Sequence, residues 1–273
     1  MFHEKEDKKT SKKPLDTSWQ KATNWYDALV GTEGHHYHKN VILPNALKLL
    51  TLDVHSHLLD LGCGQGVLSR CMPKDAHYTG VDLSSKLIKL AKEQAPKNVK
   101  TAFYCHDVTL PLEIAHKGSF THAAFILSLQ NMQDQEKAIQ NASAYLKPSG
   151  KLLIVLNHPA FRIPRQTSWG FDEQTKIQYR KLNSYLSSQK IPIHMHPGKT
   201  PSEKNHDDVT WSFHYPISAY AAFLKKSGFL IEALDEWCSD KESSGGASKW
   251  ENRARKEFPL FLAILAVKNS SVS

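Results

Sequence analysis

Apolar positions from residue 57 onward fall into short continuous runs that alternate with segments of helical periodicity. The runs of strand length occupy residues 57–61, 77–83, 99–107, 121–129 and 150–157. Because these runs are apolar throughout rather than at every second position, they are typical of parallel strands covered on both faces. Strands and helices in alternation predict a doubly wound α/β sheet.

Two of the intervening helices have recognisable ends. One opens on the serine pair 84–85, where a side-chain oxygen can cap the first turn, and it stops at Pro96. The other begins after Asp134, an equally suitable capping residue, and stops at the Pro-Ser-Gly sequence 148–150. Both helices therefore fit between consecutive predicted strands.

The C-terminal part of the chain follows a different order. Residues 217–229 have the pattern of an amphipathic helix, and residues 229–238 and 258–268 have that of strands. A polar segment rich in serine and glycine joins these two strands. We expect that segment to be a mobile loop.

Two further segments fall outside the alternation. Residues 19–56 contain a predicted helix that packs in front of the first strand, and residues 158–214 form an aromatic-rich insertion. We expect the insertion to act as a lid that caps the open edge of the sheet. Residues 1–18 are highly charged and are expected to form a disordered basic tail, which leaves residues 19–273 as a single domain.

The composition is that of a soluble globular protein, with 273 residues, 40% hydrophobic and 23% charged. No apolar run reaches the roughly 18 residues that a membrane-spanning helix needs. The four cysteines include no CxxC pair, so we expect a cytoplasmic protein without disulfides. The formal net charge of +8 arises partly in the basic tail, and we interpret the rest as a generic basic surface.

Histidine is abundant, with fifteen residues in the chain. The groups at 35–38 and 194–196 lack the HExxH spacing of a helical zinc site and have no cysteine partner. We therefore expect surface or loop histidines and no metal site.

The stretch LLDLGCGQG, residues 58–66, places glycines at 62, 64 and 66 directly after the first strand. A P-loop would need the pattern GxxxxGK[ST], and no Lys-Ser or Lys-Thr pair follows. A dinucleotide-binding loop would have its third glycine where Val67 stands. The loop therefore disfavours a nucleoside triphosphate and, less strongly, a dinucleotide.

Three acidic residues lie at the ends of the first three predicted strands. Asp82 stands twenty residues after Gly62, where a carboxylate can accept both ribose hydroxyls of an adenosine. Asp107 can accept from an adenine amine with Val108 against the ring, and Asp60 can face a cationic amine. Three acids at successive strand ends would repel a pyrophosphate, but they suit a nucleoside cofactor that carries positive charge.

The stretches LLDLGCGQG, GVDLS, CHDV and LKPSGKLLIVLN resemble the successive motifs of class I S-adenosylmethionine-dependent methyltransferases. The resemblance covers residues 55–157 and is greatest to the methyltransferase-11-like branch, which includes quinone-biosynthesis enzymes. It implies S-adenosyl-L-methionine as the cofactor. It also implies a seven-stranded, mostly parallel sheet of order 3-2-1-4-5-7-6 whose last strand is antiparallel.

The resemblance also implies a set of cofactor contacts. The end of the first strand and the glycine loop would line the methionine moiety. Asp82 would hold the ribose, and Asp107 would bind the adenine edge. The stretch ILSLQN after the fourth strand would face the sulfonium and the substrate, and tyrosines within residues 19–56 would cover the cofactor. The implied residues are Tyr26, Tyr37, Asp60, Gly62, Gly64, Asp82, Leu83, Asp107, Val108, Leu127 and Gln130.

The methyl acceptor is constrained by motifs that are missing. Residues 126–134 contain no NPP[YFW] motif of amino-group nucleic-acid methyltransferases, no nucleophilic cysteine of cytosine-C5 enzymes, and no acidic pair of protein arginine methyltransferases. This favours a small-molecule substrate. Within the insertion, one interpretation is a general base with groups that bind an anionic or planar substrate, and the alternative is a histidine that bonds the backbone, arginines that brace the lid and aromatic residues that form a small core. The candidate bases are His158 and His214, and the candidate substrate-binding residues are Arg162, Arg165 and Trp169.

Two other functional classes stay open at this level. One is a methyltransferase that modifies RNA or a protein and uses the basic charge of the chain. The other is a cofactor-binding protein without catalysis. The sequence does not indicate the acceptor atom or the oligomeric state.

Overall fold

The computed structural model describes residues 17, 20, 35–194 and 209–270. Several sequence predictions lie outside these residues. They are Tyr26, most of the predicted basic tail, the part of the predicted N-terminal region that precedes residue 35 (apart from Gln20), and residues 195–208 of the predicted lid.

The centre of the molecule is a seven-stranded sheet of order β10-β11-β5-β4-β1-β2-β3. Only β11 runs antiparallel to its two neighbours in this sheet, while the other described pairs are parallel. The predicted strand order, with the last strand inserted antiparallel between the fifth and sixth, is therefore confirmed. The strands are β1 (His57–Leu61), β2 (His77–Asp82), β3 (Lys100–Cys105), β4 (Phe120–Ile126), β5 (Leu146–Asn157), β10 (Phe229–Trp237) and β11 (Phe261–Lys268).

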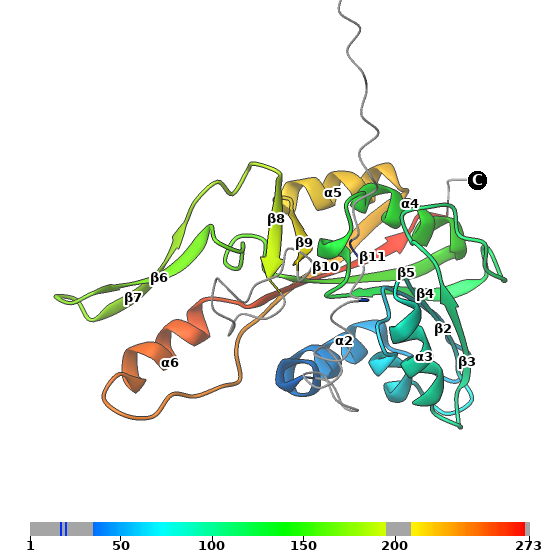
Figure 1. The fold of residues 1–273 in the computed structure, drawn as a ribbon, viewed down its shortest axis with the longest axis horizontal. Coiled ribbons are helices and arrows are strands. Elements are labelled where there is room, and N and C mark those ends of the chain that lie inside the picture. Colours follow the sequence, from blue (N-terminus) through cyan, green and yellow to red (C-terminus); the bar gives the residue numbers. More distant parts are fainter. Residues whose placement is uncertain (1–16, 18–19, 21–34, 195–208, 271–273) are drawn as a thin grey trace, which may run out of the picture.

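Helices cover both faces of the sheet, as Figure 1 shows. On one face lie α4 (Gln135–Tyr145) and α5 (Ile217–Lys226), and on the other lie α2 (Leu43–Leu50) and α3 (Ser85–Glu93). Buried side chains of the helices pack on the apolar strands in each layer, which explains why the strands are apolar throughout. Among the described residues, no helix is both long enough and apolar enough to cross a membrane.

The two predicted helix starts are confirmed by their capping contacts. The side chain of Ser84 accepts the backbone N–H of Leu87, and that of Asp134 accepts the N–H of Lys137. The end predicted for the second helix is wrong, because α4 stops at Tyr145 and β5 begins at the next residue. Pro148 explains the early stop, since the residue before a proline disfavours helical geometry.

The polar segment before the last strand is not the loop that its composition suggests. It contains α6 (Ser248–Glu257), in which Ala254 is buried. The ring of Trp250 lies 5.4 Å from that of Phe171. This contact with a segment about eighty residues earlier contributes apolar packing that the polar helix cannot supply alone.

The predicted lid divides into two antiparallel pairs. The hairpin β6 (Thr167–Asp172) and β7 (Ile177–Leu182) lies against α6 and projects from the body as an arm, while β8 (Gln189–His194) and β9 (Val209–His214) stay on the body. The second pair lies beside the turn that follows β4. The expectation of one lid over the sheet edge is therefore wrong for the β6–β7 arm.

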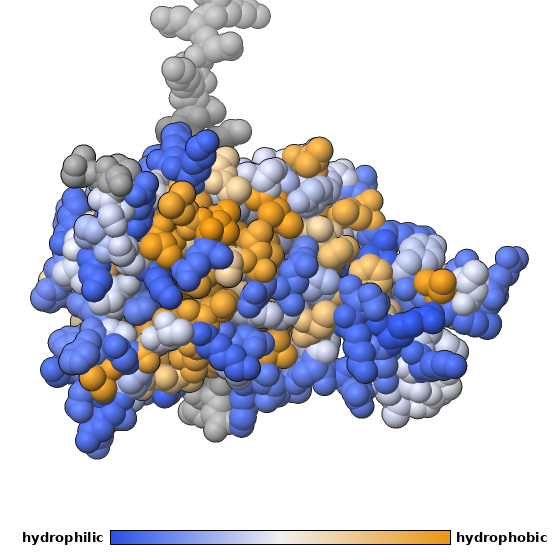
Figure 2. Space-filling view, turned by 180° about the vertical axis from the view of Figure 1, so that it is seen from behind, coloured by the Kyte–Doolittle hydropathy of each residue, from blue (hydrophilic) through white to orange (hydrophobic). Residues whose placement is uncertain are grey.

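The body exposes apolar side chains on the face seen from behind. The edge strand β10 leaves Leu230 64% and Leu234 52% exposed. Figure 2, a view from behind, shows apolar residues gathered over the body, whereas the projecting arm is mostly hydrophilic.

Three histidine rings cluster at the amino ends of β1 and β2, beside a small cavity of about 220 Å³. The ring centroid of His57 lies 5.4 Å from that of His77 and 5.5 Å from that of His116. Burial lowers the pKa of His57 to about 4, and the charges of the other two rings act in the same direction. The His57 imidazole is therefore neutral at physiological pH.

We expect His57 to make folding sensitive to acid. Because its folded pKa lies below the unfolded value near 6.5, its stabilising contribution is complete above that pH and is lost as the pH falls toward 4. After allowance for partial exposure to solvent, the loss between pH 7 and pH 5 is about 1 kcal/mol. In urea unfolding, the free energy that His57→Gln loses between pH 7 and pH 5 should be smaller than the loss of the parent by this amount.

Two features make the comparison specific. The His55→Gln variant, which changes an exposed neighbour, should keep the pH dependence of the parent. Asp60 has a pKa raised by burial to about 7, so it stabilises the folded state as the pH falls and opposes the histidines. It is present in all three proteins and cancels in the difference. Identical pH profiles for parent and His57→Gln would contradict the assignment.

Candidate functional site

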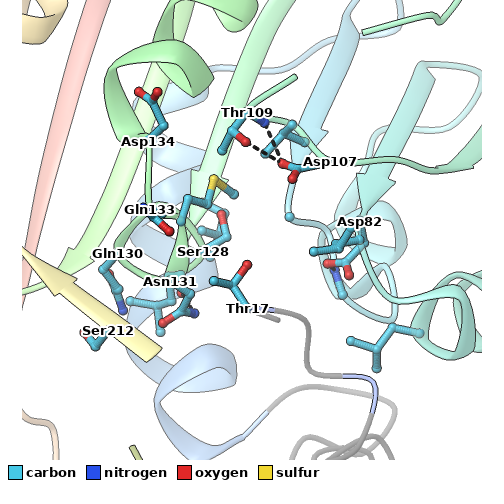
Figure 3. A pocket seen from close by; sticks show the side chains of 18 of the residues that line it. Thr17, Asp82, Asp107, Thr109, Ser128, Gln130, Asn131, Gln133, Asp134 and Ser212 are labelled. Carbon is cyan, nitrogen blue, oxygen red and sulfur yellow. Dashed lines mark hydrogen bonds between the residues drawn. The ribbon is translucent and has the colours of Figure 1, made fainter. Parts of the chain in front are cut away.

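A cavity of about 610 Å³ opens at the carboxyl ends of the central strands. This is where parallel α/β sheets bind ligands, because the loops that follow the strands meet there. Figure 3 shows polar side chains from several of these loops pointing into the space. Its wall includes Thr17, His38, Gly62, Gly64, Asp82, Leu83, Asp107, Val108, Leu127, Ser128, Gln130, Asn131, Asn157, Ile193 and Ser212.

The glycine loop forms one wall and leaves no room for side chains. Gly62 and Gly64 have φ of +77° and +55°, values that favour glycine. A β-carbon on Gly62 would lie 2.4 Å from Cβ of Ser128. Ser128 is held in place because its hydroxyl donates to the backbone oxygen of Leu61 at 2.6 Å. The bare backbone of the loop therefore borders the cavity.

Asp82, at the tip of β2, ties the glycine loop to the start of α3. Its Oδ2 accepts the N–H of Gly64 at 2.9 Å, and its Oδ1 accepts the N–H of Ser84 at 2.8 Å. Burial raises the pKa of this carboxyl group, and the two N–H groups oppose that rise. Each oxygen keeps a further lone pair, so a ligand hydroxyl can also be accepted.

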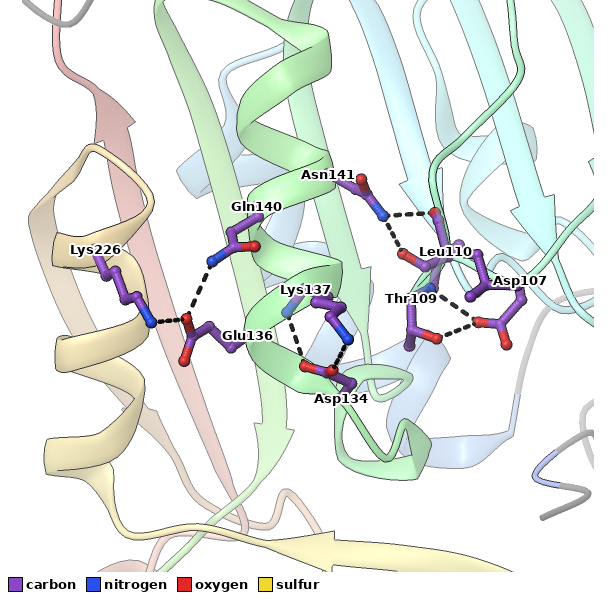
Figure 4. A network of polar contacts seen from close by, with 10 residues as sticks. Asp107, Thr109, Leu110, Asp134, Glu136, Lys137, Gln140, Asn141 and Lys226 are labelled. Atoms are coloured by element: carbon purple, nitrogen blue, oxygen red, sulfur yellow. Dashed lines mark hydrogen bonds and ion pairs between the residues drawn. The ribbon is translucent and has the colours of Figure 1, made fainter. Parts of the chain in front are cut away.

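Asp107 follows β3 and presents its carboxylate from a tight turn. Oδ1 accepts both the backbone N–H and the hydroxyl of Thr109, at 2.9 and 2.7 Å, and Oδ2 has no hydrogen-bond partner among the described residues. The amide of Asn141 in α4 donates to the backbone oxygens of Val108 and Leu110, at 2.8 and 2.7 Å, which fixes the turn (Figure 4). The free oxygen is available to a ligand amine.

Asp60 does not line the cavity. It is 2% exposed on β1, and its Oδ2 accepts the hydroxyl of Tyr78 at 2.6 Å. Its Oδ1 is buried without a partner in the described part of the chain. The structure therefore places this predicted contact of the methionine moiety within the sheet rather than on the cavity wall.

The segment after β4 reaches the cavity, as the ILSLQN stretch suggested. Leu127 has a φ of +54°, an uncommon value for this residue type, and its N–H donates to Val155 at 2.9 Å. Gln130 is 9% exposed, and its side-chain oxygen accepts the N–H of Asn157 at 3.3 Å. Both predicted residues thus lie on the wall formed by the ends of β4 and β5.

His38 is a cavity residue that the sequence analysis assigned to a surface or loop. Its Nδ1 is buried and has no hydrogen-bond partner among the described residues. Burial lowers its pKa to about 4, so the ring is neutral at physiological pH. Its proximity to two other histidines in sequence hid its position, because only the packing of α2 on the sheet brings it to the cavity.

The two predicted bases do not reach the cavity. The Nδ1 of His158 accepts the N–H groups of Ala160 and Phe161, so its Nε2 carries the proton and donates to Glu236 at 2.7 Å. His214 is 6% exposed and lies 2.7 Å from the backbone oxygen of Tyr185. These contacts do not support general-base catalysis by either residue, and both histidines stabilise turns of the insertion.

The predicted substrate-binding residues also lie off the cavity wall. Arg165 is exposed, and Trp169 sits on the β6–β7 arm under the guanidinium of Arg180. Arg162 packs on the ring of Phe261, close to Tyr37. Tyr37, a predicted cover of the cofactor, likewise packs on Phe261 and does not border the cavity.

The charges of the cavity decide which ligand fits. Two carboxylates at adjacent strand tips, Asp82 and Asp107, disfavour phosphate groups and accept hydroxyl and amine donors. Leu83 is 40% exposed beside them and offers an apolar surface to a base ring. The residues therefore fit a nucleoside with a positively charged substituent.

Comparison with known proteins supports this chemistry. Residues 59–154 match the family model described as a methyltransferase domain. A ubiquinone biosynthesis O-methyltransferase of Coxiella burnetii is 35% identical over 100 residues, which are 36% of this chain and 42% of that protein. The match thus spans less than half the length of this curated relative.

Solved structures share the fold across most of the chain. A methyltransferase from Mesorhizobium loti, described as S-adenosylmethionine dependent, has a TM-score of 0.60 at 23% identity and covers 82% of this chain and 96% of its own. The [4+2]-cyclase SpnF has a TM-score of 0.55 at 15% identity, with 94% and 98% covered. SpnF is named for a different reaction, so these similarities establish the fold alone.

The matched segment contains the glycine loop, strands β2, β3 and β4, and parts of β1 and β5. Residues 59–154 match a methyltransferase domain, and the chain has the fold of solved structures that are described as S-adenosylmethionine-dependent methyltransferases.

Proposed function

We propose that the protein transfers the methyl group of S-adenosyl-L-methionine to a hydroxyl group of a small molecule. The observation that carries the proposal is that one cavity joins the carboxylates of Asp82 and Asp107 to the imidazole of His38. The carboxylates suit the cofactor, and the neutral imidazole suits a hydroxyl acceptor. The curated relatives are named as O-methyltransferases, which agrees with this acceptor class.

The cofactor contacts follow from the groups that the wall offers. Asp82 accepts the ribose hydroxyls, and the free oxygen of Asp107 accepts the adenine amine. Leu83 and Val108 contact the adenine ring, while Gly62 and Gly64 border the methionine moiety. Asp60 acts from behind the loop, and Leu127 and Gln130 shape the space where the acceptor meets the methyl group.

When bound, the cofactor supplies a methyl group that is already activated on a sulfonium. The protein therefore needs mainly to align the acceptor and to exclude water. His38 would accept the proton that the acceptor hydroxyl gives up on methylation, so that the acceptor leaves as a methyl ether.

Calorimetry and a transfer assay test the proposal together. We expect S-adenosylhomocysteine to bind at one site, and a labelled methyl group to appear on catechol-type phenols but not on RNA or on a protein acceptor. In His38→Ala, kcat should fall about 100-fold while cofactor affinity is unchanged, because a positioned base typically contributes about 100- to 10,000-fold and one whose pKa is lowered to about 4 lies at the lower end of this range.

The His55→Ala variant is the matched control, since His55 is exposed and precedes β1, at the end of that strand away from the cavity. It should keep the parent rate. Labelled RNA without labelled phenol would replace the small-molecule proposal by nucleic-acid methylation. Full turnover of phenols by His38→Ala would remove the proposed base and leave the reaction class intact.

A further inference from the structure

Arg162 is a partly buried arginine whose guanidinium has no hydrogen-bond acceptor in the described part of the chain. It lies in the turn after β5, where its backbone N–H donates to His158 at 2.8 Å, and its Cζ is 5.2 Å from the centroid of the Phe261 ring. Among the described residues, its guanidinium makes no hydrogen bond and no ion pair. The side chain is partly withdrawn from water and no described residue gives its guanidinium an acceptor, so the guanidinium is available to an anionic ligand.

Arg180 shows how the same residue type looks when the protein satisfies it. Its guanidinium donates to the backbone oxygen of Phe161 and to the hydroxyl of Thr167 at 2.7 Å, and it stacks 4.7 Å from the ring centroid of Trp169. Arg180 thus has protein acceptors for its guanidinium, whereas Arg162 has only a ring contact among the described residues.

The surroundings of Arg162 are positively charged. The charges of Lys241, His36 and Arg162 add to burial in lowering the pKa of His35, which places these groups near one another. The adjacent acids are engaged, since Asp240 bonds His36 at 3.0 Å and Glu236 bonds His158 at 2.7 Å. Arg162 and Lys241 therefore present positive charge that these acids do not neutralise.

Aromatic rings line the same place. Tyr37 packs edge-on against Phe261 at 5.7 Å between centroids, and Nζ of Lys241 lies 5.1 Å from the Tyr37 ring centroid. The Tyr37 hydroxyl is fixed by Ser239 at 3.1 Å. A ring that bears an anionic substituent finds both an apolar surface and cations in this arrangement.

This cluster adjoins the cavity along two chain segments. His38 and Asn157 are on the cavity wall, and Tyr37 and His158 are their immediate neighbours in sequence. Phe261 pairs with Asn157 in the sheet. An acceptor whose hydroxyl lies at His38 is therefore bordered by this cluster on its far side.

We propose that Arg162 and Lys241 form an oxyanion-binding subsite that holds a carboxylate or phosphate of the methyl acceptor. The subsite rests on the proposed methyl transfer for its role, but its ligand chemistry can be measured by itself. It narrows the acceptor to a small hydroxylated molecule that also carries an anionic group. A guanidinium suits such a group because it donates two parallel hydrogen bonds.

Calorimetric titration of the whole protein with benzoate, phenyl phosphate and neutral benzamide tests the subsite. We expect at least one of the two anions to bind and benzamide to bind at least tenfold more weakly. Arg162→Gln should weaken anion binding at least tenfold. The matched control Arg253→Gln removes the same charge from an exposed position on α6 and should leave anion binding unchanged.

S-adenosylhomocysteine binding in the same three proteins separates the two proposals. Equal affinity for it in parent and variants, together with loss of the anion only in Arg162→Gln, supports the subsite. No anion binding to the parent, equal binding of benzamide, or equal weakening in both variants would overturn it. Failure of the parent to bind S-adenosylhomocysteine would instead reject the methyltransferase proposal, whatever the anions do. Whichever of benzoate and phenyl phosphate binds more tightly shows whether the subsite prefers a carboxylate or a phosphate.

Discussion

Replacement of Gly62 by alanine is expected to lower the free energy of unfolding by about 3 kcal/mol or more. The left-handed φ of +77° costs a residue with a β-carbon about 1–2 kcal/mol. The new β-carbon would also lie 2.4 Å from Cβ of Ser128, closer than carbon atoms can approach. Ser128 cannot rotate that atom away, so the backbone must shift, at a further cost of about 1–3 kcal/mol.

Gly118→Ala isolates the effect of the close contact. Gly118 has nearly the same φ, +75°, but a β-carbon there would meet nothing within 4 Å. Urea unfolding should therefore show a loss of only about 1–2 kcal/mol for this variant. If the two variants lose the same free energy, the contact with Ser128 does not restrict position 62, and the account of the glycine loop is wrong.

The sheet and the cofactor side of the site could be predicted, because short stretches of sequence indicate the strands and the residues at their ends. In a parallel sheet all strands end at one edge, so acids at the ends of successive strands must approach one another. Asp82 and Asp107 line the cavity for this reason. Asp60 lies one residue before the end of β1, and its side chain is buried against the neighbouring strand. Strand ends estimated from sequence are too imprecise to separate such a buried position from one that borders the cavity.

The rest of the site depends on contacts between distant segments. His38 reaches the cavity because α2 packs on β5 and β11, and nothing within residues 35–38 indicates that packing. Arg162 was predicted to bind an anion at the cavity mouth. The turn after β5 instead places it on the ring of Phe261, off the cavity wall. The arm and α6 stabilise each other through Trp250 and Phe171, so neither segment shows its structure alone.

Removal of the Asp82 carboxylate is expected to weaken S-adenosylhomocysteine binding about 1000-fold. Two charge-assisted hydrogen bonds to the ribose, at about 2 kcal/mol each, account for this factor. Asp82→Ala also leaves the N–H groups of Gly64 and Ser84 without their acceptor, which loosens the loop that borders the methionine moiety. Calorimetry measures the affinity, and thermal unfolding establishes that the variant is folded.

Two further variants serve as controls for the Asp82→Ala experiment. Asp235→Ala removes a carboxylate from the edge strand β10, far along the sheet order from β2, and should bind with the affinity of the parent. Asp82→Asn keeps the side-chain shape and one acceptor, so it should fold even if the alanine variant does not. Because an amide cannot accept at both oxygen positions, its affinity should still fall steeply. Parent-like affinity in Asp82→Asn would mean that the ribose lies elsewhere in the cavity, and the free oxygen of Asp107 would then be the next group to test.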